Sequence, residues 1–238
     1  IVMLDLDGIS ESEIELLKTL DYSPLLGKTN ADCPIDNLTP LVNKAIYGKF
    51  YDYPLSVIGD SLSTRLEFLE FLKEKLHIID AGSSVMGGTR ISGNNANSYW
   101  QDKRVNAISA DAKLVIIYGG MNDAGSFTVG DMNIRNYDTN TVVGAMNVLL
   151  SKLYYRYTKP SKGYYQNNGV DYSGVQQIEN PLNKLNIIII TPPQRPLLGG
   201  YEKMAELAPK ITEIARMWSI PCANGYAEMQ YNTMLFDL

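Results

Sequence analysis

From residue 55 to the end of the chain, short apolar runs alternate with longer segments of helical periodicity. The apolar runs predict strands at 55–58, 77–80, 114–118, 187–191 and 220–223. Apolar residues spaced three or four apart predict helices at 62–76, 141–157 and 201–218. Strands that alternate with helices form a parallel sheet with helices on both faces. The sequence therefore predicts an α/β fold, a three-layer α/β/α sandwich around a mostly parallel sheet of about five strands.

Residues 1–53 do not follow this alternation, so we interpret them as an N-terminal lead-in or appendage to a domain at 54–238. Ser10 and Glu13 have the spacing of a capping box, which predicts a short helix at 11–20. Residues 159–181 interrupt the domain and are rich in Tyr, Asn and Gly. We expect this insertion to be a surface loop or a small hairpin, although its composition is also one that contacts sugars.

Composition and charge exclude several classes of protein. The chain is 45% hydrophobic and 20% charged, as is typical of a globular protein. A net charge of −5 without a basic stripe argues against a nucleic-acid partner. No apolar run approaches the roughly 20 residues of a membrane-spanning helix. With His77 as the single histidine, and with Cys33 and Cys222 interpreted as separate thiols, we predict no metal site and no cofactor.

In a parallel sheet, ligands bind beyond the carboxyl ends of the strands, so candidate chemistry is sought there. The first strand ends in Gly59-Asp60-Ser61 and a helix follows at once. A serine at this position places its hydroxyl at the ligand edge and its N–H at a helix N-terminus, which favours nearby negative charge. By itself the triplet is also ordinary turn and N-cap sequence.

The second predicted strand leads into a glycine-rich turn at 80–89. Gly82, Gly87 and Thr89 have the spacing of a phosphate-binding loop, but Gly88 stands where that loop requires lysine. Without the lysine the phosphates would lose their main charge partner, so nucleotide binding is rejected. A turn whose backbone N–H groups face a site fits this segment better.

The third predicted strand ends in Gly119-Gly120-Met121-Asn122-Asp123. An asparagine at a strand end can direct a side-chain N–H at a developing oxyanion. Glycine and asparagine are also frequent in plain turns, so this segment alone does not decide between the two interpretations.

Taken together, the three segments resemble the SGNH hydrolases, also known as GDSL-like lipases and esterases. Ser61 matches the nucleophile of that family, with Asp60 in the same block. Asn122 matches the oxyanion asparagine, flanked by Gly120 and Asp123 as supporting residues. Further similarity lies at 98–123 (including Arg104), 144–146 and 191–195. The resemblance covers roughly 55–238 and implies an SGNH/flavodoxin-like sandwich with an oxyanion hole built from Ser61, a glycine and Asn122.

The chain departs from the family pattern at the glycine block and at the C-terminus. Val85 occupies the place of the family's second glycine, so either Gly82 or Gly87 is the backbone donor. The family's last block is Asp-x-x-His; Asp237 matches its aspartate, which would orient the histidine, and the sequence ends at Leu238. His77 begins a predicted strand, and even a four-residue strand spans roughly 13 Å, so it does not replace the missing base.

We therefore expect a partial chain, because it begins at Ile1 and stops inside the last block. The first hypothesis is a serine carboxylic-ester hydrolase that acts through an acyl-enzyme on a small-molecule or glycan ester, for example an acetylated carbohydrate. The alternative is a non-catalytic glycan-binding or structural domain within a larger complex, for example a phage tail. Both hypotheses favour an extracellular, cell-surface or virion-associated location, although the sequence does not fix the compartment.

Overall fold

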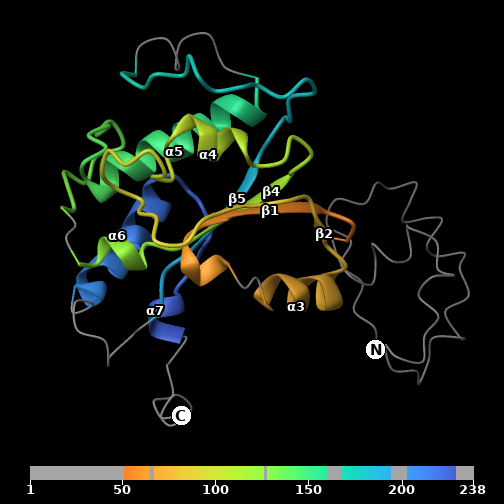
Figure 1. Cartoon of the computed structure of the whole chain (residues 1–238), viewed down its shortest axis with the longest axis horizontal. Coiled ribbons are helices and arrows are strands. Elements are labelled where there is room, and N and C mark those ends of the chain that lie inside the picture. The colour runs from red at the N-terminus through yellow and green to blue at the C-terminus, as the bar shows by residue number, and fades with distance from the viewer. Residues whose placement is uncertain (1–50, 65–66, 126–127, 160–167, 194–202, 229–238) are drawn as a thin grey trace, which may run out of the picture. The chain divides into compact units, whose positions relative to one another are not determined.

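A computed structural model describes residues 51–64, 67–125, 128–159, 168–193 and 203–228 (Figure 1). The chain divides into two compact units. The first comprises Ile1–Tyr53 and Glu67–Ile79, and the second comprises Pro54–Leu66 and Asp80–Leu238. Most of the predicted appendage, with its helix at 11–20, lies outside the described residues.

The described part of the first unit contains helix α3 (Glu67–Leu76). The helix ends at Leu76, and His77 directly after it has a left-handed backbone with φ of 52°. The predicted strand at 77–80 is therefore shorter than expected, because β2 comprises only Ile79–Asp80. The predicted helix at 62–76 is likewise replaced by the short 3-10 helix η3 (Ser61–Ser63) and by α3.

Each pair of neighbouring strands described below is parallel. β1 (Pro54–Gly59) pairs with β4 (Leu114–Tyr118), β4 pairs with β5 (Asn186–Ile190), and β5 pairs with β6 (Cys222–Ala223). On the other side of β1 the edge strand is interrupted. There β3 (Ser84–Val85) pairs in parallel with the end of β1, and the Ala81 N–H donates to the Leu55 carbonyl.

The strand order is β2-β1-β4-β5-β6, so the chain steps to one side of β1 and then continues on the other side. This is the flavodoxin-like order, in which ligands bind at the reversal point, beyond the ends of the first strand and its later neighbour. In this protein that point lies between the ends of β1 and β4. Both strands end in the segments that the sequence predicts to be functional.

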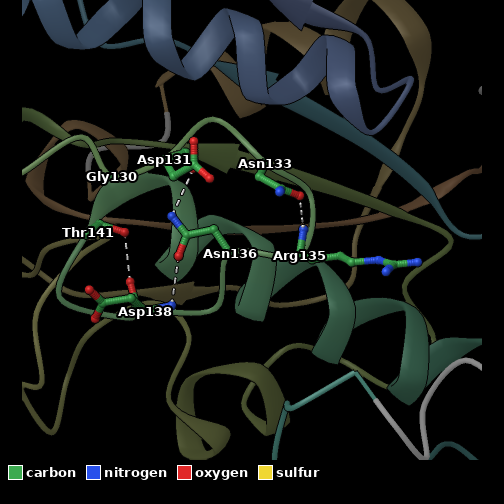
Figure 2. Close-up of a pocket in the computed structure, with 7 residues that line it drawn as sticks. All are labelled: Gly130, Asp131, Asn133, Arg135, Asn136, Asp138 and Thr141. Carbon is green, nitrogen blue, oxygen red and sulfur yellow. Dashed lines mark hydrogen bonds between the residues drawn. The ribbon is translucent and has the colours of Figure 1, made fainter.

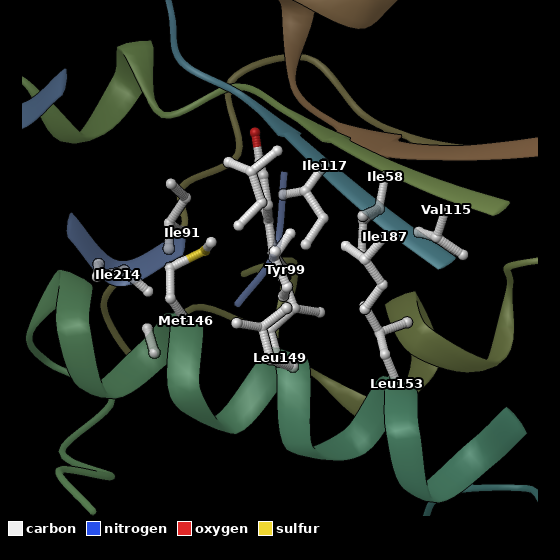
Figure 3. Packing of buried hydrophobic residues seen from close by; sticks show 14 of the residues in the cluster. Ile58, Ile91, Tyr99, Val115, Ile117, Met146, Leu149, Leu153, Ile187 and Ile214 are labelled. Atoms are coloured by element: carbon white, nitrogen blue, oxygen red, sulfur yellow. The ribbon is translucent and has the colours of Figure 1, made fainter. Parts of the chain in front are cut away.

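One face of the sheet is covered by α4 (Asp102–Asn106), α5 (Val142–Tyr157) and α6 (Met204–Met217), whose apolar side chains share one buried cluster with the strands. In Figure 3, Met146, Leu149 and Leu153 of α5 point toward the isoleucines of the sheet. Thr141 is the N-cap of α5, and its hydroxyl accepts from the Gly144 N–H at 3.1 Å. A short helix, α7 (Gly225–Glu228), follows β6.

The predicted α/β class with a mostly parallel sheet is confirmed. The strands at 55–58, 114–118 and 187–191 and the helices at 141–157 and 201–218 are found within a few residues of their predicted bounds. The described part of the insertion, 168–181, contains no helix or strand. It is not an open aromatic surface, because Tyr172 is buried and stacks on Tyr155 with ring centroids 4.6 Å apart. None of the described helices has the length and apolar character needed to cross a membrane.

Candidate active site

Ser61 is the first residue of η3, directly beyond the end of β1. Its side chain is exposed, and within the described residues its hydroxyl has no hydrogen-bond partner. The preceding residue, Asp60, is fully buried and caps the turn by accepting from the Leu62 N–H at 2.9 Å. The two neighbours therefore differ in role, since Asp60 is fixed inside the fold while Ser61 faces outward.

Glycine is required at the end of β1 and directly after β4, because neighbouring groups lie too close for a Cβ atom at either position. A Cβ atom at Gly59 would lie 2.2 Å from the Tyr118 carbonyl oxygen and 2.3 Å from Ser63 Oγ. Ser63 fills that space and donates to the same Tyr118 oxygen at 2.7 Å. A Cβ at Gly119 would lie 2.0 Å from the Tyr99 hydroxyl. These contacts explain both glycines by packing and fix the turn that carries Ser61.

Asp60 also joins this turn to the one after β4, where Gly120 has a left-handed φ of 104° and donates its N–H to Asp60 Oδ2 at 3.0 Å. The Tyr99 hydroxyl lies beside the same carboxyl group without a hydrogen bond of ordinary geometry. Burial raises the pKa of Asp60, and the N–H groups of Leu62 and Gly120 partly offset that rise. With both oxygens engaged by backbone donors, Asp60 is a structural link.

Of the two glycines proposed as oxyanion donors, Gly87 is the one beside Ser61. A Cβ at Gly87 would lie 3.9 Å from Ser61 Cβ, and no described residue accepts from its N–H. Gly82 instead donates its N–H to Asp80 Oδ1 at 2.9 Å, and a Cβ there would meet nothing within 4 Å. The geometry therefore favours Gly87 over Gly82.

Asn122 is attached to the same turn as Gly87. It lies in the 3-10 helix η4 (Met121–Asp123), and its Nδ2 donates to the Thr89 carbonyl at 2.9 Å. Thr89 in turn donates its hydroxyl to the Met86 carbonyl at 2.7 Å, which closes the turn around Gly87. Since an amide group carries two N–H donors, Asn122 retains one beyond its bond to Thr89.

Asp123, 1% exposed, holds the next part of this segment. Its carboxylate accepts from the Ile91 N–H at 2.8 Å, from the Ser92 N–H at 2.9 Å and from the Ser92 hydroxyl at 2.6 Å. Burial raises the pKa of Asp123, and the bonds to Ser92 and Ile91 lower it. Asp123 thus supports the loop without reaching the surface.

Neither Asp237, the predicted partner of the base, nor His77, which the sequence analysis excludes as the base, belongs to the described part of the second unit. His77 belongs to the first unit, where its ring centroid lies 5.7 Å from that of Tyr51 and its carbonyl accepts from the Asp52 N–H. Asp237 lies outside the described residues. In the described part of the chain, Ser61, Gly87 and Asn122 therefore form the candidate site.

Sequence reasoning did not assign roles to Arg104 and Tyr99, which lie buried under the site. Tyr99 has a pKa raised well above its usual range by burial and by the charges of Asp60 and Asp123. Arg104 lies with its guanidinium 5.5 Å from the centre of the Tyr99 ring. Only the family-like run at 98–123 pointed toward either residue, because neither follows the apolar periodicity of an element.

A separate polar pocket of about 380 Å³ lies in the loop between η4 and α5 (Figure 2). Its lining residues are Gly130, Asp131, Asn133, Arg135, Asn136, Asp138 and Thr141. Asn136 donates to the Asp131 carbonyl at 2.9 Å, and Thr141 donates to the Asp138 carbonyl at 2.8 Å. No group of three His, Cys, Asp or Glu side chains that could hold a metal ion occurs among the residues the structure describes.

Comparison with known proteins supports the fold alone. No family model matches the chain, and no curated protein matches it. A solved structure of a protein from Lactobacillus plantarum is 16% identical with a TM-score of 0.54, covering 76% of this chain and 80% of that one. A second solved structure is 15% identical with a TM-score of 0.53, covering 76% of this chain and 81% of the other.

Proposed function

We propose that this protein is a serine ester hydrolase with Ser61 as its nucleophile. The observation that carries the proposal is the pairing of an exposed Ser61, whose hydroxyl has no partner in the described residues, with Gly87 directly beside it. The pair lies at the reversal point of the sheet, where folds of this order bind their ligands. Asn122 is bonded to the turn that carries Gly87, which brings a third donor to the same segment.

In the proposed reaction, Ser61 Oγ attacks the ester carbonyl carbon and gives up its proton to a base. The N–H groups of Ser61 and Gly87 and the remaining Nδ2–H of Asn122 stabilise the negative charge on the carbonyl oxygen. Collapse of the tetrahedral intermediate breaks the bond to the alcohol, which leaves with the proton. Water then attacks the acyl-enzyme and releases the acid and free Ser61.

The base is the part of the mechanism that the described residues do not supply. Asp60 and Asp123 are unsuitable, because both are buried and their oxygens are occupied by backbone or serine donors. In the family that the sequence resembles, the base is a histidine three residues after the aspartate that Asp237 matches. We propose the same arrangement here, with Asp237 orienting that histidine. On the basis of the same resemblance, we propose an acylated carbohydrate as the substrate.

Hydrolysis of p-nitrophenyl acetate by the protein expressed from its complete coding sequence tests the proposal. We expect Ser61→Ala to reduce the rate to that of buffer. Ser173→Ala is the matched control, since it removes an exposed serine hydroxyl from the segment at 168–181, which contains no proposed site residue, and we expect it to retain activity. Equal rates for the wild type and Ser61→Ala would contradict the proposal and favour a non-catalytic glycan-binding or structural domain.

A further inference from the structure

The side chain of Arg104 is only 3% exposed and lies at the point where β1, β3 and the turn at 86–89 meet. Its Nη2 donates to the Gly59 carbonyl and to the Ser84 carbonyl, each at 2.8 Å. Its Nε donates to Ser84 Oγ at 3.0 Å. Its Nη1 donates to the Asn97 carbonyl at 3.1 Å and to Thr89 Oγ1 at 3.3 Å. All five guanidinium N–H donors are thereby used.

Burying the charged Arg104 side chain costs more free energy than its packing alone would justify. Within the described residues no carboxylate lies within ion-pairing distance of Arg104, so its acceptors are carbonyls and hydroxyls. Taking a cation out of water without an ion-pair partner is expensive, and an apolar side chain would fill the same volume at lower cost. What an apolar side chain lacks is the rigid planar fork that can bind several segments at once.

Arg104 binds the segments that determine the positions of the proposed oxyanion-hole donors, which are the N–H groups of Ser61, Gly87 and Asn122. Gly59 accepts from both Arg104 and the Met86 N–H, and Ser61 follows two residues later. Thr89 accepts from Arg104 through its hydroxyl and from Asn122 through its carbonyl. Gly87 lies between Met86 and Thr89. Met86 shares the Gly59 carbonyl with Arg104, and Thr89 accepts from Arg104 directly, so both ends of this turn are connected to the same guanidinium.

We propose that Arg104 is a positioning residue for the Ser61 site: its guanidinium fixes the turn at 84–89 against the end of β1 and so places the Gly87 N–H beside Ser61. This inference rests on the proposed function for its effect on turnover. It does not make Arg104 a catalytic residue, because its donors are all occupied within the fold. Its effect should therefore be on kcat rather than on substrate affinity.

Arg156 provides a matched control. It is 5% exposed, it also donates to backbone carbonyls, including that of Ile108 at 3.1 Å, and its guanidinium lies 5.4 Å from the centre of the Tyr157 ring. Its acceptors are the carbonyls of Asn106, Ile108 and Gln176, none of which belongs to the turns that carry Ser61, Gly87 and Asn122; Asn106 ends the helix that contains Arg104, but it is not a partner of the Arg104 guanidinium. Arg104→Lys and Arg156→Lys thus make the same chemical change in equally buried places.

The experiment measures kcat and KM for p-nitrophenyl acetate in both variants, with melting temperatures. We expect Arg104→Lys to lower kcat roughly 100-fold, as displacement of a catalytic group by about 1 Å can, with KM changed less than about twofold. Arg156→Lys should keep kcat within about twofold. Wild-type kcat in Arg104→Lys, a change in KM alone, or parallel losses of kcat in both variants would each overturn the proposal.

A second variant and a second readout cover other outcomes. If Arg104→Lys does not fold, Ser84→Ala removes the acceptor of the Arg104 Nε and leaves the bond from the Thr89 hydroxyl to the Met86 carbonyl in place. We expect kcat to fall on the order of tenfold; an unchanged kcat would overturn the proposal. If the wild type shows no Ser61-dependent turnover, the proposed function fails. Hydrogen exchange still tests whether the Arg104 guanidinium fixes the turn at 84–89 against β1. The Met86 amide should then exchange on the order of tenfold faster in Arg104→Lys than in Arg156→Lys. Equal exchange would show that Arg104 does not hold the turn.

Discussion

Asp60 Oδ2 accepts a 3.0 Å hydrogen bond from the Gly120 N–H, and this bond joins the turn after β1 to the turn after β4. The other oxygen of Asp60 accepts from the Leu62 N–H in the turn that begins with Ser61. One buried carboxylate therefore sets the geometry of both turns. Within the Gly-Asp-Ser triplet, Asp60 therefore has a structural role, and Ser61 is the residue proposed to react with the substrate.

Replacement of Asp60 by asparagine should lower the free energy of unfolding by roughly 1–3 kcal/mol, because an amide group leaves one of the two N–H donors unpaired in the interior. Urea unfolding measures the change. Asp80→Asn is the matched control, since Asp80 is exposed and, among the described residues, accepts from the Gly82 N–H alone, so its effect should stay within about 0.5 kcal/mol. Equal losses in the two variants would contradict the structural role of Asp60.

The buried carboxyl of Asp123 should make stability depend on pH. Because burial raises the pKa of Asp123, the folded state retains this proton to a higher pH than the unfolded chain does. Its contribution is therefore most favourable below the unfolded pKa of about 3.9 and is lost as pH rises through the folded pKa. Unfolding free energies of the wild type and Asp123→Asn should show a difference, wild type minus variant, that declines with rising pH. A difference that is constant or that grows with pH would contradict this assignment.

Two glycines at the site should respond to alanine in opposite ways. Gly59→Ala forces a methyl group to 2.2 Å from the Tyr118 carbonyl oxygen, so we expect a loss of at least about 3 kcal/mol or a failure to fold. Gly87→Ala meets nothing nearer than 3.9 Å, so stability should stay within about 0.5 kcal/mol. The added methyl stands beside Ser61, and esterase kcat/KM should fall. Thermal melting and turnover measure both effects, and a stable, fully active Gly59→Ala would refute the packing argument.

The sheet could be predicted from the sequence because each of its main strands is a short run of apolar residues, which is a local pattern. Residues 114–118 are apolar throughout and are buried throughout, as a central parallel strand requires. α5 begins at Val142, within one residue of the start that the periodicity predicts. The glycine-rich strand ends were also visible. The close approaches that require these glycines, of the Tyr118 carbonyl to Gly59 and of the Tyr99 hydroxyl to Gly119, depend on the folded structure.

The support beneath the site could not be predicted in the same way. Arg104 lies in a helix of five residues, too short for a clear periodic signal, and its partners are spread from Gly59 to Asn97. The choice between Gly82 and Gly87 also depended on folding, because only the structure places one of them against Ser61. The short edge strand β3 was missed since it consists of two residues within a turn-like segment.

Covalent labelling of Ser61 tests the central claim most directly. A fluorophosphonate reacts with an activated serine, whose Oγ bonds to phosphorus as fluoride leaves, and the adduct can be located by peptide mass spectrometry. We expect the protein expressed from its complete coding sequence to carry the adduct on Ser61, and not on the nearby Ser63, which is buried and donates to the Tyr118 carbonyl. Absence of an adduct on Ser61 in the folded protein, under conditions that label a known serine esterase, would contradict its assignment as the nucleophile.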